Sequence, residues 1–423
     1  MKTSLDKITL GIVGIFAALQ VYLLLHYFNL LEVSGDANLY VNNAIHHAKV
    51  GLPYPTAFNN YDCYIQSPGY VNFLALLYAV FGTFRAVLVF KVLFNLAIVT
   101  EIYFLANHFF GKKTASISVI LYCLMPVNIF ASINFYNEID YMFLALTAFT
   151  LCIWGKKYWA FVFAGLLFAY AHTIRPIEVV LILCIFIYFY VKKYCYKPYL
   201  LLLVPYILSL SLYGLYCKSQ TGYFITTSTV TGHNLIFIAN DQSDGGQPHT
   251  LKLHYTPGKI GYIPHLNQVH FAKKDSIWKA RGINWIKQHP FHYLKSYLHG
   301  ATLIMFRNDS WSISKLSPYD DIEDVNKMPD PQKAHWILYA RQFGYSLVYY
   351  LTLLAFAFSL FVNRRSLLSL KALFVLIPVL TVMGTSLLGT ETRYHYPFMF
   401  AVIIWGAFGC EKLLEKNNIT CKF

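Results

Sequence analysis

The chain has 423 residues, of which 57% are hydrophobic and 13% are charged. Soluble proteins carry about a quarter charged residues, so this composition excludes a soluble globular protein and indicates an integral membrane protein. The net charge of +14 is spread over short basic clusters between apolar runs, so we expect membrane lipids and no nucleic acid as partners. Apolar runs approaching the ~20 residues needed to cross a bilayer predict an all-α polytopic protein rather than a barrel.

About ten transmembrane helices are expected from these runs. In chain order the predicted crossings are residues 8–31, 84–108, 114–131, 138–154, 158–174, 176–191, 198–217, 339–362, 366–388 and 394–413. Segment 67–83 is apolar but short and begins near Pro68, so it is predicted to be an interfacial helix.

The crossings divide the chain into three parts. Residues 1–217 form an N-terminal transmembrane module whose first outer loop is 32–83, residues 218–338 form an extracytoplasmic loop region, and residues 339–423 carry the C-terminal transmembrane helices.

Basic residues favour the cytoplasmic ends of membrane helices. The clusters fall on alternate ends of the predicted crossings, at Lys2 and Lys7, Lys112 and Lys113, Lys156 and Lys157, Lys192, Lys193 and Lys197, Arg364 and Arg365, and Lys412 and Lys416. All of them lie on one side if both termini are cytoplasmic. A multi-pass protein of the cell membrane is therefore expected, with the loops between the other helix ends on the extracytoplasmic face.

That outer face collects a group of ionisable residues at helix ends. Asp36 follows the first crossing, Glu138 and Asp140 begin the fourth, and Arg175 and Arg393 stand at two further ends. Arginine binds phosphate through its planar fork, and a carboxylate can accept a proton from a hydroxyl group. The pattern therefore suits a site for an anionic lipid phosphate and a hydroxyl acceptor.

Each of these residues also has a structural interpretation. Asp36 can cap the helix predicted after it, and acids such as Glu138 and Asp140 are favoured at helix starts. Arg175 precedes Pro176 and can extend its side chain to lipid headgroups, and Arg393 can be an ordinary anchor. The eight cysteines follow neither a disulfide nor a metal-ligand spacing.

Several motifs occur in an order that resembles a known family. They are Asp36 with Tyr40 four residues later, "SPGYVNFLALLYAVFG" (67–82), "AGLLFAYAHTIRP" (164–176), "ARGINWIKQHPFHYLK" (280–295) and "ETRYHYPFMF" (391–400). In this order they resemble GT-C glycosyltransferases, the type that includes bacterial protein O-mannosyltransferase-like enzymes and lipid A aminoarabinose transferases. The likeness extends over nearly the whole chain.

The resemblance implies a sugar transferase that uses a polyprenyl-phosphate sugar as its donor on the extracytoplasmic face. Asp36 matches the catalytic base of an inverting transfer, and Glu138 matches the second acidic position. Arg175 and Arg393 match positions suited to the lipid phosphate. Many members have Glu after the aspartate, where this chain has Ala37, and Pro-Pro where it has Ser67–Pro68. These departures leave the acceptor and the use of a divalent metal open.

Five further residues beside these motifs are expected to bind substrate: Tyr40, Asp140, His172, Tyr394 and His395. The expected partners are the lipid-linked donor and a hydroxyl acceptor on a glycan, lipid or protein, in cell-envelope glycan or glycoprotein synthesis. No cofactor is required by the residues, and no metal ligands are assigned. A transporter or flippase of lipid-linked sugars, and an O-antigen polymerase or ligase, remain the alternatives.

Overall fold

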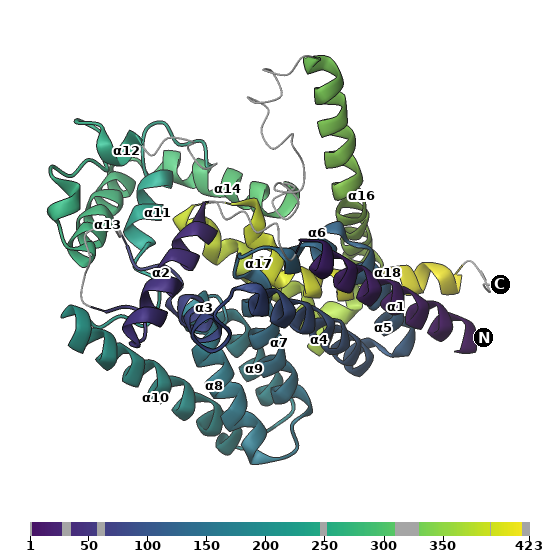
Figure 1. Ribbon diagram of the computed structural model, residues 1–423. Coiled ribbons are helices and arrows are strands. Elements are labelled where there is room, and N and C mark those ends of the chain that lie inside the picture. Colours follow the sequence, from purple (N-terminus) through teal and green to yellow (C-terminus); the bar gives the residue numbers. More distant parts are fainter. Residues whose placement is uncertain are drawn as a thin grey trace.

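The computed structural model of the chain describes residues 2–27, 35–56, 64–245, 252–308, 330–389 and 391–416 (Figure 1). Every regular element within these ranges is a helix, so the all-α prediction is confirmed. Parts of the predicted segments, residues 28–34, 57–63, 246–251, 309–329, 390 and 417–423, lie outside the described residues.

Long apolar helices form the body of the molecule. Within the described residues, six helices have the length and composition to cross a membrane: Leu5–Tyr27, Arg85–Phe110, Tyr196–Thr221, Tyr339–Val362, Leu370–Leu388 and Arg393–Glu415. A seventh candidate is the pair α5 (Lys112–Leu124) and Pro126–Ile133, which are bent by 64° where Pro126 interrupts the helix. The other predicted crossings are the shorter helices α7 (Glu138–Trp154), α8 (Tyr158–Ile174) and α9 (Val179–Val191).

The N-terminal helices pack in a continuous bundle. The helix α1 (Lys2–Tyr27) contacts α5, α4 (Arg85–Phe110) contacts α5 and α7, and α8 packs on both α7 and α10 (Tyr196–Thr221). The C-terminal helices α16 (Pro331–Val362), α17 (Leu373–Thr385) and α18 (Met399–Lys416) complete it, with α18 against α5 and α16.

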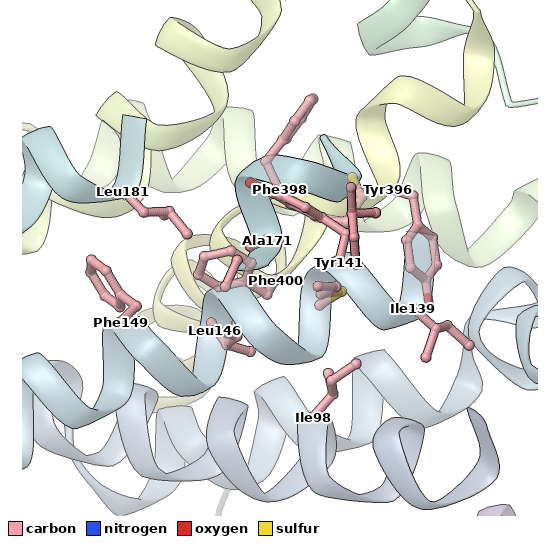
Figure 2. Packing of buried hydrophobic residues seen from close by; sticks show 14 of the residues in the cluster. Ile98, Ile139, Tyr141, Leu146, Phe149, Ala171, Leu181, Tyr396, Phe398 and Phe400 are labelled. Carbon is pink, nitrogen blue, oxygen red and sulfur yellow. The ribbon is translucent and has the colours of Figure 1, made fainter. Parts of the chain in front are cut away.

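The core of this bundle lies around α7. Figure 2 shows Leu146 and Phe149 of α7 beside Ile98 of α4, Ala171 of α8 and Phe400 of α18, all of them buried. The opposite situation holds on the outer helices, where apolar side chains remain exposed. Such exposed apolar faces suit contact with lipid acyl chains.

The helix α10 presents one apolar face to the surroundings. Leu208, Leu212 and Leu215 are each more than half exposed, and their spacing of four and three residues places them on one side of the helix. One face of α10 therefore packs against the bundle, and the opposite face is available for contact with lipid.

A second layer of shorter helices lies at one end of the bundle (Figure 1). It comprises α2 (Asp36–Val50), α3 (Pro68–Phe81), α11 (Thr231–Ile238), α12 (Lys252–Tyr255), α13 (Phe271–Gln288) and α14 (Pro290–Phe306). Helix α3 has 14 residues, too few for a straight crossing, and it coincides with the predicted short helix 67–83. We call these six helices the outer layer.

The start of α1 and the end of α18 lie at the end of the bundle away from the outer layer (Figure 1). Lys112 at the start of α5 forms an ion pair with Asp6 of α1 at 2.7 Å, and Lys113 pairs with Glu415 of α18 at 3.6 Å. The first basic loop and both terminal helices thus meet at one end, as the alternation of basic clusters requires.

Candidate active site

Asp36 stands at the first position of α2, where the outer layer meets the bundle. Gly35 is the N-cap residue, with a φ of 56°, and Asp36 is the first residue of α2 and the acid of its first turn. Its carboxylate instead pairs with the guanidinium group of Arg393, with Oδ2 bound to Nη2. Gln66 donates a further hydrogen bond to it. The side chain of Asp36 therefore faces the arginine cluster from the first turn of α2, and Gly35 holds the N-cap position.

Arg393 connects three carboxylates. Besides Asp36 it binds Glu391 Oε2 through Nε, and the same Nε lies 3.8 Å from Glu138 Oε1. Its guanidinium carbon lies 4.8 Å from the ring centre of Tyr136, in a cation–π arrangement. Its side chain is only 12% exposed, so the 3₁₀ helix η7 (Thr392–Phe398) holds it inside the cluster.

Arg175 approaches Glu138 from the other side. It follows the last residue of α8, and Pro176 prevents the helix from continuing. Its Nη2 binds Glu138 Oε1, and its Nε donates to Asn137 Oδ1 at 2.8 Å. Glu138 is 1% exposed, and its second oxygen has no hydrogen-bond partner among the described residues.

The charges of this cluster determine the state of Asp36. Burial alone would raise the pKa of this carboxyl group, but the charge and hydrogen bond of Arg393 outweigh it and hold the pKa below its usual value. The Asp36 side chain is 28% exposed, against 1% for Glu138. Asp36 is therefore an ionised carboxylate whose side chain is partly accessible from outside the cluster.

Tyr40 lies one helical turn after Asp36 and is buried. Its hydroxyl group accepts a hydrogen bond from Ser67 Oγ at 3.5 Å, and Ser67 in turn accepts one from Asn137 at 2.7 Å. Burial raises the pKa of Tyr40 well above its ordinary value, which keeps it a neutral phenol. It links α2 to the start of α3 beside the cluster.

Asp140, two residues after Glu138 in α7, belongs to a separate ion pair. It forms an ion pair with Lys91 of α4 at 2.9 Å, and both side chains are almost fully buried. The ammonium group of Lys91 also donates to the carbonyl oxygen of Tyr136 and lies 5.3 Å from the ring centre of Tyr70. The sequence argument missed Lys91, although a single lysine within the apolar run 86–100 is a costly residue that signals a buried partner.

The remaining expected substrate residues divide between the cluster and its surroundings. The ring of Tyr394 lies 5.5 Å from the guanidinium carbon of Arg175. The structure places His172 against Glu178, with Nδ1 2.7 Å from its carboxylate. His395 is fully buried and lies beside the carbonyl oxygen of Ile304 at 3.2 Å. Thus the cluster includes Tyr394, whereas the partners found for the two histidines lie outside it.

The carboxylates are arranged for arginine rather than for a metal ion. Within the described residues, no three His, Cys, Asp or Glu side chains are placed to hold a metal ion together. Glu138, Asp36 and Glu391 each direct an oxygen to a guanidinium group. As they stand in the described part of the chain, these residues do not fit a metal ion.

The fold matches solved membrane proteins. The oligosaccharyltransferase of Archaeoglobus fulgidus in the apo form aligns with a TM-score of 0.53 at 13% identity, over 96% of this chain and 51% of that one. The AglB enzyme of the same organism, solved with an inhibitory peptide and a dolichol-phosphate, gives 0.48 at 15% identity over 98% and 52%. ArnT from Cupriavidus metallidurans, bound to undecaprenyl phosphate, gives 0.41 at 12% identity over 98% and 81%.

The match at a TM-score of 0.53, together with the apolar helices, identifies the chain as an all-α membrane protein with the GT-C fold. It spans about half the length of the archaeal oligosaccharyltransferase chain. Residues 66–217 match the family described as Dolichyl-phosphate-mannose-protein mannosyltransferase, so the resemblance to GT-C glycosyltransferases is confirmed. No curated protein matches the chain in sequence.

Proposed function

We propose that the chain is a membrane glycosyltransferase that moves a sugar from a polyprenyl-phosphate donor to an acceptor hydroxyl group, with inversion at the anomeric carbon. The observation that carries the proposal is the cluster of Asp36, Arg393, Glu138 and Arg175. It combines an ionised, partly exposed carboxylate with two buried guanidinium groups at the end of a membrane bundle. The family match of residues 66–217 supports the same class of donor.

The proposed reaction uses these groups in defined roles. The acceptor oxygen attacks the anomeric carbon while the bond from that carbon to the phosphate oxygen breaks. Asp36 accepts the proton of the acceptor hydroxyl group. Polyprenyl phosphate leaves with the bonding electron pair, and Arg175 and Arg393 stabilise its growing negative charge, a contribution often worth about 3–4 kcal/mol for one well-placed donor.

Donor binding requires the arginines to exchange partners. In the structure both guanidinium groups are bound by carboxylates, so an incoming phosphate replaces part of these contacts. Phosphate and carboxylate present similar pairs of oxygens to the guanidinium fork, which makes this exchange chemically reasonable. When Arg393 turns to the phosphate, Asp36 loses its strongest counter-charge and becomes a better base.

The proposed orientation in the membrane rests on the basic residues. The loop containing Lys112 and Lys113 lies with both terminal helices at one end, which the positive-inside rule assigns to the cytoplasm. The cluster and the outer layer then lie on the extracytoplasmic face. The donor is expected to be presented there, and the acceptor belongs to the cell envelope.

The experiment that tests the proposal follows donor turnover. The purified chain in lipid nanodiscs receives a panel of labelled polyprenyl-phosphate sugars with an envelope extract, and release of free polyprenyl phosphate is measured. General-base catalysis contributes about 10²–10⁴-fold, so Asp36→Asn should reduce release by about that factor. Asp6→Asn, at the opposite end of the bundle, is the matched control and should release normally.

Two results would contradict the proposal. Near-normal release of polyprenyl phosphate by Asp36→Asn would show that Asp36 is not the catalytic base. Movement of intact lipid-linked sugar across sealed vesicles, with no release of lipid phosphate by the wild type, identifies a transporter instead.

A further inference from the structure

Asn137 occupies the N-cap position of α7, yet its side chain does not cap that helix. Asparagine is favoured at this position because its oxygen can accept a hydrogen bond from a backbone N–H group of the first turn. Here the oxygen instead accepts a hydrogen bond from Nε of Arg175 at 2.8 Å, and Asn137 is only 1% exposed. The amide therefore serves the arginine and not the helix.

The other end of this amide is held as well. Nδ2 of Asn137 donates to Oγ of Ser67 at 2.7 Å, and Ser67 is the N-cap residue of α3. Because Nε of Arg175 can only donate, this network allows one orientation of the amide, with its oxygen towards the arginine. Asn137 is thus fixed at both ends, between the start of α3 and the end of α8.

Ser67 makes this contact from a strained backbone conformation. Its φ is 41°, in the left-handed region that a residue with a side chain rarely adopts. Such a conformation persists only where the surrounding contacts over-determine it, and strained residues of this kind cluster at functional sites. The hydrogen bond to Asn137 is one of these contacts, and it lies one residue away from Arg175 along the network.

The second arginine of the cluster is held in a similar way. Nε of Arg393 binds Glu391, and its Nη2 binds Asp36. In each arginine, therefore, one partner holds Nε and a different partner holds Nη2. The two differ in charge, because Nε of Arg393 meets a carboxylate, whereas Nε of Arg175 meets a neutral amide.

We propose that Asn137 is a positioning residue for the phosphate of the donor and acts through Arg175, an inference that rests on the proposed function. The amide holds Nε, so that both Nη groups keep their direction when the phosphate displaces Glu138. A group whose direction is set beforehand loses less conformational entropy on binding. Because the amide is neutral, it leaves the positive charge of the guanidinium group to the phosphate.

The test measures binding of tritiated farnesyl phosphate to the whole chain in lipid nanodiscs. This probe has a phosphate and a short prenyl chain but no sugar, so it reports on the phosphate site without requiring turnover. Empty nanodiscs give the background from partition into lipid, and unlabelled farnesol, which lacks the phosphate, should compete poorly. Arg175→Gln and Asn137→Leu should each weaken binding by about tenfold, the effect of losing a hydrogen bond to a charged group.

The number of binding sites per chain separates positioning from stability. A partly unfolded preparation loses sites, whereas a misdirected guanidinium group binds more weakly at every site. Asn137→Leu should therefore keep the number of sites of the wild type and lose affinity. The same substitution at Asn42, an exposed asparagine of α2 that bonds to Asn38, is the matched control and should bind as the wild type does.

A double variant decides whether Asn137 acts through Arg175. Residues that act as one unit have non-additive effects, so Asn137→Leu should change binding by less than about twofold when Arg175→Gln is already present. A purely structural role would lower binding by the same factor in both backgrounds.

Ser67→Gly loosens the amide without removing it. Glycine adopts a positive φ without strain, so relief of the backbone should offset the lost hydrogen bond, and the melting temperature should change little. The hydroxyl group that holds the Asn137 amide is nevertheless absent. We expect farnesyl phosphate to bind about threefold more weakly, the effect of losing one neutral hydrogen bond.

The outcomes distinguish this inference from the proposed function. If the wild type binds farnesyl phosphate through Arg175, then equal binding by Asn137→Leu and the wild type overturns the inference alone, and so does an equal loss in both backgrounds. Absence of binding by the wild type, or binding that Arg175→Gln does not weaken, contradicts the donor-phosphate site itself and with it the proposed function.

Discussion

Asp36 and Arg393 stand 357 positions apart in the chain and form the central pair of the cluster. Their contact has two opposing effects on the Asp36 carboxylate. Arg393 keeps Asp36 ionised in a partly buried place, yet the same charge weakens it as a base. The balance is testable, because the pKa of a catalytic base sets the acidic limb of the pH profile.

Arg393→Gln should move the acidic limb of the pH profile of turnover to higher pH. Without the guanidinium charge, burial dominates and raises the pKa of Asp36, so the base becomes protonated at a pH where the wild type is still active. The measurement is kcat/KM for donor turnover against pH. The position of the limb is the readout, since the amplitude also falls with weaker phosphate binding.

Arg175→Gln is the control for this shift. Arg175 binds Glu138 rather than Asp36 and contributes less to the lowered pKa of Asp36 than Arg393 does. Its acidic limb should move less than that of Arg393→Gln. Equal shifts in the two variants would mean that the pH profile reports another group.

Much of this cluster follows from the sequence alone, and the reason is topological. Asp36, Glu138, Arg175 and Arg393 all stand at helix ends that the alternation of basic loops places on one face. The individual partners do not follow, because they depend on side-chain directions at those ends. The bond between Glu391 and Arg393, for example, depends on the turn with which Glu391 leads into η7.

Between elements, the pair of Lys91 in α4 and Asp140 in α7 joins two helices of the bundle core. Removing one partner leaves a buried charge without compensation, which costs about 3–5 kcal/mol. Lys91→Met should therefore lower the free energy of unfolding by about that amount. The measurement is thermal or denaturant unfolding in nanodiscs.

The double variant Lys91→Met with Asp140→Leu separates charge from packing. Replacing both partners by apolar residues of similar volume is often neutral or stabilising, so the double variant should be more stable than Lys91→Met alone. A double variant as unstable as Lys91→Met would show that the pair matters through shape and not through charge.

Another close contact joins α3 to the end of α8 that precedes Arg175. A Cβ atom on Gly69 would lie 2.0 Å from Thr173 Oγ1 and 3.1 Å from Ile174 Cγ1. Gly69→Ala should cost about 1–3 kcal/mol of stability, the usual effect of overpacking. It should also reduce turnover, because the helix end that positions Arg175 must shift.

The control for this contact is Gly14 in α1. A Cβ atom there meets nothing within 4 Å, and alanine favours a helix interior by about 0.5–1 kcal/mol over glycine. Gly14→Ala should leave the melting temperature unchanged or raise it. If both alanine variants destabilise equally, the α3–α8 contact is not the cause.

The helix bounds show which predicted crossings hydropathy alone locates correctly. The predicted crossings 84–108 and 198–217 correspond to α4 (85–110) and α10 (196–221), because long apolar runs between basic clusters have one solution in a membrane. The run 114–131 is instead broken at Met125–Pro126. Hydropathy also gave no account of the loop region 218–338, where amphipathic helices such as α13 pack on one another.

At the scale of the whole molecule, this chain shares its fold with a solved protein to which it has little sequence identity. The match to the archaeal oligosaccharyltransferase covers 96% of this chain at 13% identity. Such a likeness is possible because apolar helix faces tolerate many exchanges as long as volume and pattern persist. The candidate site lies instead at helix ends, where an exchange at Glu138, Arg175 or Arg393 would break a specific ion pair.

The orientation of the whole bundle leads to a prediction that native cysteines can test. Cys195 is exposed at the start of α10, whereas Tyr213, near the other end of this helix, donates to the carbonyl oxygen of Tyr54 in the outer region. A helix of 26 residues is about 40 Å long, enough to place Cys195 and the outer layer on opposite membrane faces. If the termini are cytoplasmic, Cys195 must also be cytoplasmic.

In sealed right-side-out vesicles, a membrane-impermeant maleimide should therefore spare Cys195 and label a cysteine introduced by Gln268→Cys. Both variants carry serine at Cys63 and Cys421, which lie outside the described residues, so that these thiols do not contribute. After permeabilisation Cys195 should react as well, which shows that its thiol is accessible. Labelling of Cys195 before permeabilisation would show that the orientation is the opposite of the proposed one. The arginine cluster would then lie on the cytoplasmic face, where a flipped lipid-linked donor could not reach it.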